Sequence, residues 1–324
     1  MTAPVLSIIM PLYNSERFIG QAIQSILTQS FKDFELIIID DASSDGSLDI
    51  VKEFKDSRIR ILRNEKNQGI SFTRNKGLNV ASGRFIAPFD SDDVAMPDKF
   101  EKQVRFLESH PGYGMIGSWA RLIDQNGNFL KKRWKLQAKP EAIAAILLFR
   151  NYFCHSSIVM RCEAIPFGGY DERLQLDEDY KMWIEIARKW KVWNLQEYLL
   201  HYRVHSDSIT RKDHISVSLY DHKIYKENFE LLGIALTRQQ LNLLTFMKDQ
   251  DAIENKKTLI EIESFLLHII KKNAERNLFD QKELVKVVFN RWLKVLHKTR
   301  GSNLAMPALF LKSPLLRTYL SVIA

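Results

Sequence analysis

The sequence predicts an α/β fold in which a mainly parallel sheet is flanked by helices. Short apolar runs alternate with segments of helical periodicity through the first third of the 324-residue chain. The runs are apolar throughout, as in strands that helices cover on both faces. Three of the runs end in polar or acidic turns, where ligands bind in open parallel sheets.

The alternation is regular up to residue 109. We expect buried strands at Val5–Met10, Phe34–Ile39, Arg58–Leu62 and Arg84–Phe89. Apolar residues recur at helical spacing from Phe18 to Leu27 and from Leu48 to Phe54. Further helices are predicted over Ile70–Val80 and, after Pro97, over Lys99–Ser109. The order of these segments is that of repeated β-α units, which form parallel sheets.

The middle of the chain is less regular. Further strands are predicted at Tyr113–Ile123 and His155–Met160, with short strand-like pieces within Val192–Arg203. An Asn126-Gly127 turn predicts a hairpin, and helices are predicted at Pro140–Phe149 and Tyr180–Trp190. From Val217 onward the pattern is helical, so we expect two domains: residues 1–210, which carry the predicted sheet, and residues 211–324, which are helical.

Charge is unevenly distributed between these two regions. Arg211–Ala324 contains 19 Lys and Arg residues against 12 Asp and Glu residues, whereas the preceding residues are nearly neutral. A basic helical region can contact an anionic membrane surface. A helical cap on the first domain and a homodimer interface are the alternatives. We expect no nucleic-acid partner, and the absence of signal-peptide features and of long apolar runs predicts a cytoplasmic protein, either free or peripheral at the inner face of the membrane.

The polar residues that end three predicted strands are candidates for a site. They are Pro11 to Asn14, Asp40 to Asp45, and Asp90-Ser91-Asp92-Asp93. Polar residues also end strands for structural reasons, but three such ends at one sheet edge point to a cleft. Crowded carboxylates repel one another unless a cation lies among them, and hard oxygen ligands suit Mg²⁺ or Mn²⁺. The acidic turn is therefore a candidate metal site, with Asp92 and Asp93 as ligands.

An ordered set of motifs resembles family 2 inverting glycosyltransferases of the GT-A fold, in their non-processive, bacterial form. The motifs span roughly Val5 to Ser208 and are Ser7–Asn14, Gln29-Ser30-Phe31 with Phe34–Asp41, Asn67–Gly77, Gly168–Glu172 with Glu178–Trp183, and Tyr202–His205. Ala42 stands where a glycine is common in the family, and Thr73 where an alanine is common. The Q-x-x-R-W motif of processive synthases does not follow Asp179.

The resemblance implies a donor site for a nucleoside-diphosphate sugar, with UDP as the expected nucleotide. Tyr13 would stack on the base and Asp41 would bond its edge, with Asp40 able to share that role, beside Pro11 and Asn14. Arg74 would approach the ribose or the diphosphate. Asp90, Ser91 and Asp92 would frame the nucleotide-sugar and the metal, with Asp93 as an alternative ligand.

The resemblance also implies a mechanism. The acceptor hydroxyl, on a saccharide or a lipid-linked saccharide, needs a base opposite the leaving group, and Asp179 takes that role. In-line attack would invert the anomeric configuration. The alternative for Asp177 and Glu178 is that they are first-turn carboxylates favoured by the helix dipole. His155 is interpreted as structural, whereas His205 fits a structural role and a phosphate-contacting role equally well.

Two other functions are alternatives to a glycosyltransferase. A dinucleotide-dependent oxidoreductase would need a G-x-G-x-x-G turn after the first strand, but Pro11–Gly20 contains a single glycine. A non-catalytic nucleotide-sugar-binding subunit of another transferase remains the alternative, because it would keep the same donor residues. We therefore expect a transferase of surface polysaccharide or glycolipid biosynthesis.

Overall fold

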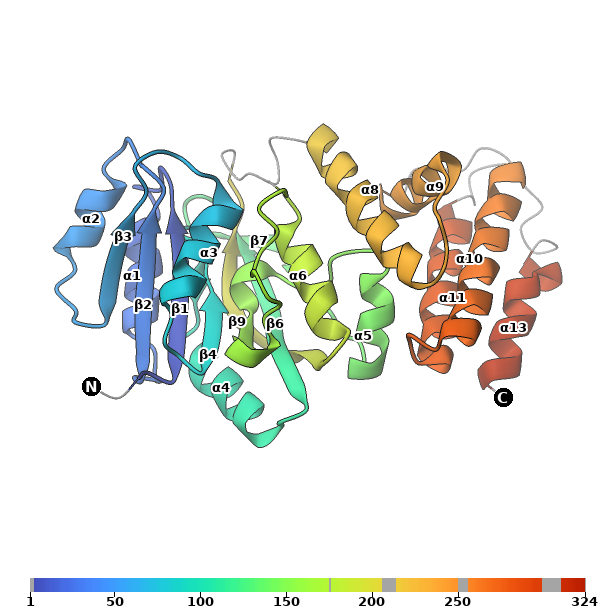
Figure 1. The fold of residues 1–324 in the computed structure, drawn as a ribbon, viewed down its shortest axis with the longest axis horizontal. Coiled ribbons are helices and arrows are strands. Elements are labelled where there is room, and N and C mark those ends of the chain that lie inside the picture. Colours follow the sequence, from blue (N-terminus) through green and yellow to red (C-terminus); the bar gives the residue numbers. More distant parts are fainter. Residues whose placement is uncertain (1–2, 175, 206–213, 250–255, 299–309, 324) are drawn as a thin grey trace. The chain divides into compact units, whose positions relative to one another are not determined.

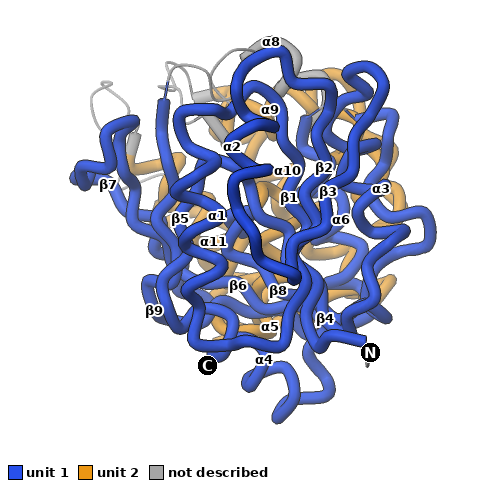
Figure 2. Tube along the Cα trace, turned by 90° about the vertical axis from the view of Figure 1, so that its left-hand side faces the viewer, with its two compact units in different colours: residues 1–138, 152–214 blue, residues 139–151, 215–324 orange. Residues whose placement is uncertain are grey.

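The computed structural model describes residues 3–174, 176–205, 214–249, 256–298 and 310–323. Two compact units make up the chain (Figure 2): residues 1–138 with 152–214, and residues 139–151 with 215–324. The boundary predicted near residue 210 lies at residues 206–213, outside the described residues.

The first unit contains one sheet whose strands follow the order β3-β2-β1-β4-β8-β6-β9-β5, with β7 paired to β6. Figure 1 labels all of these strands except β5 and β8. Strands β1 (Leu6–Leu12), β2 (Phe34–Asp40), β3 (Ile59–Arg63) and β4 (Phe85–Pro88) are mutually parallel. Their positions confirm the first four predicted strands. Because β1 lies between β2 and β4, the three polar strand ends are adjacent at one edge of the sheet.

Both faces of this parallel region are buried, as its apolar composition predicts. Alternate residues of β1, including Leu6, Ile8 and Met10, belong to a core with helices α1 (Ile19–Leu27) and α4 (Lys99–Ser109). On the other face lies α3 (Ile70–Val80), where an added Cβ at Gly77 would come within 2.5 Å of Ile9. The glycine therefore permits close packing of α3 on the sheet. Helix α2 (Ser47–Glu53) packs beside α1.

The second half of the sheet is mixed. Strands β6 (Tyr113–Ile123) and β7 (Phe129–Trp134) form the predicted hairpin, with Gly127 at φ 87°. Strand β8 (Val159–Arg161) is antiparallel to β4 and β6, and β5 (Val94–Ala95) is antiparallel to β9 (Lys191–Arg203). Strand β9 is one irregular strand parallel to β6, rather than separate pieces. Helix α6 (Glu178–Ala187) confirms the predicted amphipathic helix.

One predicted strand was wrong in its first half. His155–Ser157 form the 3₁₀ turn η1, and β8 begins only at Val159. Ser157 donates its side-chain hydroxyl and its backbone N–H to the carbonyl of Cys154, at 2.6 and 3.0 Å, which closes the turn. A second 3₁₀ turn, η2 (Cys162–Ala164), follows β8.

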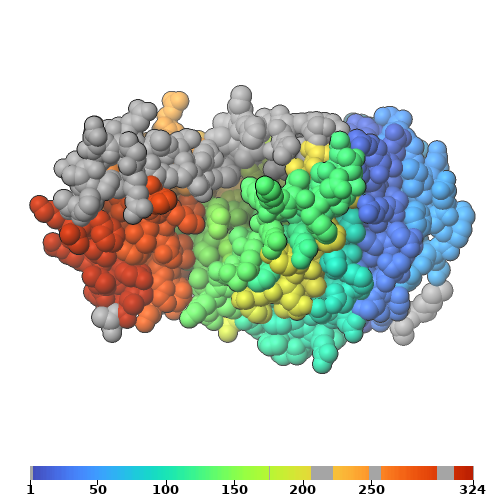
Figure 3. All heavy atoms as spheres, turned by 180° about the vertical axis from the view of Figure 1, so that it is seen from behind, coloured from blue at the N-terminus to red at the C-terminus, as the bar shows by residue number. Residues whose placement is uncertain are grey.

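The second unit is helical. Helix α5 (Pro140–Leu147) belongs to it together with α8 (His214–Leu231), α9 (Arg238–Asp249), α10 (Lys256–Arg276), α11 (Gln281–Lys298) and α13 (Pro314–Ile323). Helices α10, α11 and α13 pack on one another and form a continuous body, orange to red in Figure 3. Tyr225 donates its hydroxyl to the carbonyl of Phe149 at 2.9 Å, which ties α8 to the end of α5. Within the described residues, the structure contains no helix that is both long and apolar enough to span a membrane.

Candidate functional site

The loops after β1 and β2 hold each other through side-chain contacts with the backbone. Asn14 donates its N–H to Oγ of Ser43 at 3.1 Å, and its Oδ1 accepts the N–H of Ser44 at 2.9 Å. Asn14 and Ala42 both lie in the left-handed region, at φ 47° and 60°. Asparagine tolerates this conformation better than alanine does. The ring of Tyr13 is 52% exposed beside these loops, so it is accessible to a ligand.

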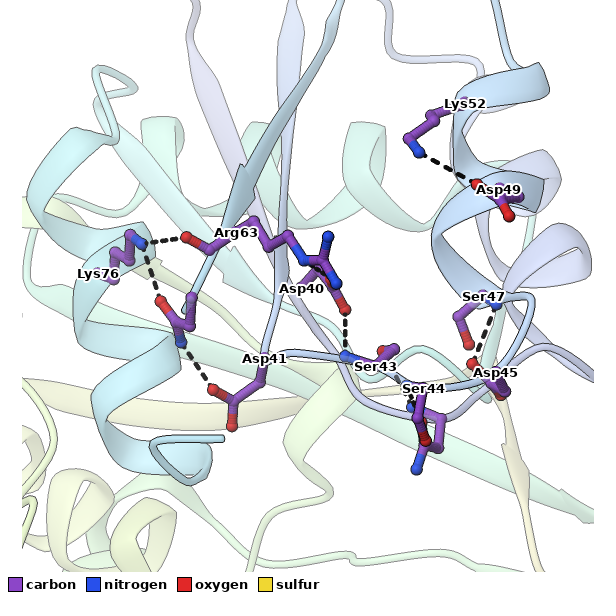
Figure 4. Close-up of polar contacts among 12 residues, drawn as sticks. Asp40, Asp41, Ser43, Ser44, Asp45, Ser47, Asp49, Lys52, Arg63 and Lys76 are labelled. Carbon is purple, nitrogen blue, oxygen red and sulfur yellow. Dashed lines mark hydrogen bonds and ion pairs between the residues drawn. The ribbon is translucent and has the colours of Figure 1, made fainter. Parts of the chain in front are cut away.

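Asp40, the last residue of β2, and Asp41, which follows it, point in different directions, as Figure 4 shows. Asp40 is fully buried; its Oδ1 accepts the N–H of Ser43 at 2.9 Å, and its Oδ2 lies 3.1 Å from Nε of Arg63. Asp41 accepts Nδ2 of Asn64 at 2.7 Å and the backbone N–H groups of Gln68 and Gly69 at 2.9 and 3.0 Å. Asp41 therefore holds the segment between β3 and α3, and a nucleobase would share its carboxylate with these donors.

Arg74 of α3 connects the end of β4 with the start of α6. Its guanidinium donates to Oδ1 of Asp90 at 2.9 Å and to Oε1 of Glu178, and its side chain is 6% exposed. Burial opposes the charge of Arg74, but Glu178 and Asp90 raise its pKa above the ordinary value. The motif of α3 thus supplies a fixed positive charge that joins two acidic segments far apart in the sequence.

The two carboxylates around Arg74 have pKa values that shift in opposite directions. Burial raises the pKa of Glu178, more than Arg74 lowers it. Burial would also raise the pKa of Asp90, but His155 and Arg74 lower it below the usual carboxyl value. Asp90 also donates its backbone N–H to Oγ of Ser156 at 3.0 Å, so turn η1 helps to fix it.

The acidic turn after β4 is held by residues at the end of β9. Oδ2 of Asp92 lies 2.9 Å from Nε2 of His205, and Arg203 donates Nε–H to the carbonyl of Asp92 at 2.8 Å. Asp93 is fully buried, and its Oδ1 accepts the backbone N–H of Arg203 at 2.8 Å. Burial and the neighbouring carboxylates of Asp92 and Asp90 raise the pKa of Asp93 well above its usual range. Ser91 donates its hydroxyl to Oγ of Ser15 at 3.0 Å, which ties the turn to the β1 loop.

The residues present fit a divalent ion that a substrate would help to hold. No group of three or more His, Cys, Asp and Glu side chains in the described part of the chain has the arrangement of a metal site. Asp92 and His205 form a pair of one oxygen and one nitrogen donor, and their side chains are 24% and 10% exposed. A magnesium- or manganese-type ion commonly takes one or two protein ligands and completes its shell with phosphates and water. Asp93, by contrast, is turned into the protein.

Asp179 lies in the first turn of α6. Its side chain is 17% exposed, Oδ1 accepts the backbone N–H of Tyr180 at 2.6 Å, and Oδ2 lies 3.6 Å from Nδ1 of His155. Asp177 precedes the helix at φ 60°, in the left-handed region that aspartate, like asparagine, tolerates better than most residues.

The structure brings most of the predicted site residues to the carboxyl ends of β1, β2 and β4. Arg74 bonds Asp90, and Ser91 contacts the β1 loop that contains Tyr13 and Asn14. Pro11 is the second-last residue of β1, where it pairs with Ile39 and is buried. Arg203 and Ser156 also position this cluster, and no role is predicted for either from the sequence. Glu178, for which only the helix-dipole role is predicted, joins them by bonding Arg74. The one signal for Glu178 and Arg203 is that both fall within the family motifs.

Sequence comparisons show the family to which this chain belongs. Residues 7–166 match the model of glycosyl transferase family 2. The chain is 36% identical over 218 residues to the putative glycosyltransferase EpsE of Bacillus subtilis, covering 65% of this chain and 77% of EpsE. It is 35% identical over 189 residues to the Escherichia coli UDP-Glc:α-D-GlcNAc-diphosphoundecaprenol β-1,3-glucosyltransferase WfgD, covering 57% of this chain and 70% of WfgD. The chain belongs to glycosyl transferase family 2.

Solved structures show the same fold at low sequence identity. Residues 1–349 of Staphylococcus aureus TarS, in complex with UDP-GlcNAc, align with a TM-score of 0.59 at 17% identity, covering 95% of this chain and 91% of that chain. The mannosyltransferase PcManGT of Pyrobaculum calidifontis, in complex with GDP-Man and Mn²⁺, aligns with a TM-score of 0.52 at 14% identity, covering 100% of this chain and 85% of PcManGT. These likenesses support the GT-A fold.

Proposed function

We propose that the chain transfers a sugar from a UDP-sugar to a hydroxyl of a lipid-linked saccharide, with inversion at the anomeric carbon. The observation that carries the proposal is that Arg74 bonds both Asp90, in the acidic turn after β4, and Glu178 at the start of α6, next to the base candidate Asp179. The choice of UDP and of a lipid diphosphate acceptor rests on the names of the relatives, WfgD in particular.

In this proposal the donor enters between the exposed ring of Tyr13 and the acidic turn. Tyr13 stacks on the base, while Asp41 and the segment that it holds line the edge of the base. A divalent ion held by Asp92 and His205, with Mn²⁺ or Mg²⁺ as the expected metal, would neutralise charge on the departing diphosphate. Arg74 keeps Asp90 in place beside that region and adds a fixed positive charge.

The acceptor hydroxyl is a weak nucleophile, so a base must take its proton during attack. Asp179 accepts the proton on its carboxylate as the acceptor oxygen bonds to the anomeric carbon. The bond from that carbon to the diphosphate breaks on the opposite side, and its electron pair leaves with UDP. The fixed start of α6 then serves to orient the base.

A donor and acceptor panel tests the proposal. The protein is incubated with UDP-glucose, UDP-GlcNAc and GDP-mannose, with a synthetic lipid-diphosphate-linked GlcNAc and with Mn²⁺, and the products are identified by mass spectrometry and by NMR of the anomeric proton. We expect an inverted product from a UDP-sugar. Binding of UDP-sugars without transfer or hydrolysis would instead favour the non-catalytic subunit, and a retained configuration would contradict the mechanism.

A further inference from the structure

The imidazole of His155 occupies a position between two carboxylates of the site. Its Nδ1 lies 3.6 Å from Oδ2 of Asp179, and its Nε2 lies 3.9 Å from Oδ1 of Asp90. The side chain is 8% exposed, and neither ring nitrogen has a hydrogen-bond partner within the described residues. A buried polar group without partners is costly, so this placement needs an explanation beyond packing.

The backbone around His155 is fixed from several sides. Ser157 closes turn η1 through its bonds to the carbonyl of Cys154, and Gln103 of α4 donates Nε2–H to the carbonyl of Ser157 at 2.7 Å. Ser156 accepts the backbone N–H of Asp90 at 3.0 Å. The turn that carries His155 is therefore attached to the same strand end that carries Asp90.

Aromatic neighbours hold the ring itself. The ring centre of Trp183 lies 5.9 Å from that of His155, and the ring centre of Tyr170 lies 6.2 Å away. Trp183 is on the same helix as Asp179 and is fully buried. Trp183 and Tyr170 thus flank the imidazole, whose two nitrogens face Asp179 and Asp90. A shift of a few tenths of an ångström would bring Nδ1 into hydrogen-bond range of Asp179.

Carboxylates lie on both sides of His155. Asp90, Glu178 and Asp179 face this region, while Arg74 is the one guanidinium that bonds two of them, Asp90 and Glu178. Tyr170 is buried and its pKa is raised, mainly by burial, so its hydroxyl stays neutral. An imidazole N–H directed at Asp179 would place a hydrogen-bond donor beside this carboxylate. Arg74 supplies its donors to the other two carboxylates, Asp90 and Glu178.

We propose that His155 is a positioning residue for the base Asp179, directing its carboxylate through Nδ1–H, while Nε2 faces the donor-side residue Asp90. The inference rests on the proposed function, because it assigns His155 a task in the same transfer. The second and simpler interpretation is that His155 only fills space between α6 and the sheet, and the two interpretations differ in their consequences for turnover.

Two isosteric variants separate these interpretations. Asparagine places its amide nitrogen close to the position of Nδ1, and glutamine places it close to Nε2. We expect His155→Ala to lower kcat by roughly 10- to 100-fold, the usual effect of losing a group that orients a functional residue. His155→Asn should recover most of that loss, whereas His155→Gln should not. The affinity for UDP, measured by titration calorimetry, should stay within about twofold of wild type in all three.

The assay measures UDP release from UDP-glucose with Mn²⁺, with and without the lipid-linked GlcNAc, alongside thermal melting of each variant. His110→Asn, in which an exposed histidine at the end of α4 is changed, is the matched control and should behave as wild type. Equal kcat in wild type and His155→Ala, equal impairment of the Asn and Gln variants, or a loss confined to UDP affinity would each overturn the inference. If the wild type releases no UDP from any donor, the proposed function fails, and the inference fails with it.

Discussion

The Oδ2 atom of Asp92 lies 2.9 Å from the Nε2 atom of His205, although the two residues are 113 positions apart in the sequence. The contact joins the acidic turn after β4 to the residues that follow β9. Arg203 reinforces it by bonding the carbonyl of Asp92 and the carboxylate of Asp93. Three separate contacts therefore fix the turn that carries Asp92.

The first prediction concerns the metal. Chelation with EDTA should abolish transfer, and Asp92→Asn or His205→Ala should raise the Mn²⁺ concentration for half-maximal activity by roughly tenfold or more, because the first removes the charge of one proposed ligand and the second removes the other proposed ligand. Metal titrations of UDP release measure this. Asp49→Asn, which changes an exposed aspartate on α2, is the control. Unchanged activity in EDTA, or normal Mn²⁺ dependence in both variants, would contradict the metal role.

The second prediction concerns the base. Asp179→Asn keeps the shape of the side chain but cannot take a proton, so kcat should fall by roughly 100-fold or more. UDP affinity should change little, since Asp179 is assigned to the acceptor side. Calorimetry with UDP, combined with the rate of transfer, separates the two quantities. A parallel loss of affinity and rate would make Asp179 a donor-binding or structural residue instead.

The third prediction concerns Arg74. Replacing it with methionine leaves Asp90 and Glu178 without their buried counter-charge, which typically destabilises a protein by about 3–5 kcal/mol. Urea unfolding of Arg74→Met measures this loss, and donor binding should weaken as well. Arg84→Met is the matched control because Arg84 and its partner Glu108 are both about half exposed, and such pairs contribute about 0–1 kcal/mol. Similar losses in both variants would refute the buried role.

Much of the fold could be predicted because it depends on local patterns. The helix predicted at Ile70–Val80 has the bounds of α3. The polar ends of β1, β2 and β4 lie at one edge of the sheet, as expected for neighbouring parallel strands. His155–Ser157 is predicted as strand but forms a 3₁₀ turn, because a buried turn of this kind has no hydrophobic periodicity that distinguishes it from a strand. The Asp92–His205 and Arg74–Glu178 contacts join distant segments, and no local pattern encodes which distant partners meet.

A fourth prediction follows from Ala42, which stands where the family commonly has glycine. Its φ of 60° lies in the left-handed region, where a side chain costs about 1–2 kcal/mol relative to glycine. Ala42→Gly should therefore stabilise the protein by ~0.5–1 kcal/mol after the entropy of glycine is subtracted. Ala81→Gly, at φ −66°, should destabilise instead. Thermal and urea unfolding of the pair test this, and a loss of stability in Ala42→Gly would contradict it.

The last prediction concerns Lys99 of α4, which is fully buried, with its amine 4.2 Å from the ring centre of Phe100. Burial lowers its pKa from 10.5 to about 7, while Cys154 and Asp93 act in the opposite direction. Between these two values the unfolded chain holds a proton that the folded protein lacks. Stability should therefore rise with pH across this window, because the unfolded state binds more protons there.

Lys99→Met keeps a side chain of similar length and removes the amine. The variant should be more stable than wild type at pH 7, and the difference should shrink as pH rises toward 10.5, where the unfolded chain also begins to lose the proton. Urea unfolding at pH 7, 8, 9 and 10 measures the difference, in which the other titrating groups cancel. Lys102→Met, a partly exposed position on the same helix, should show no such convergence. A constant difference at every pH would mean that Lys99 is charged in the fold.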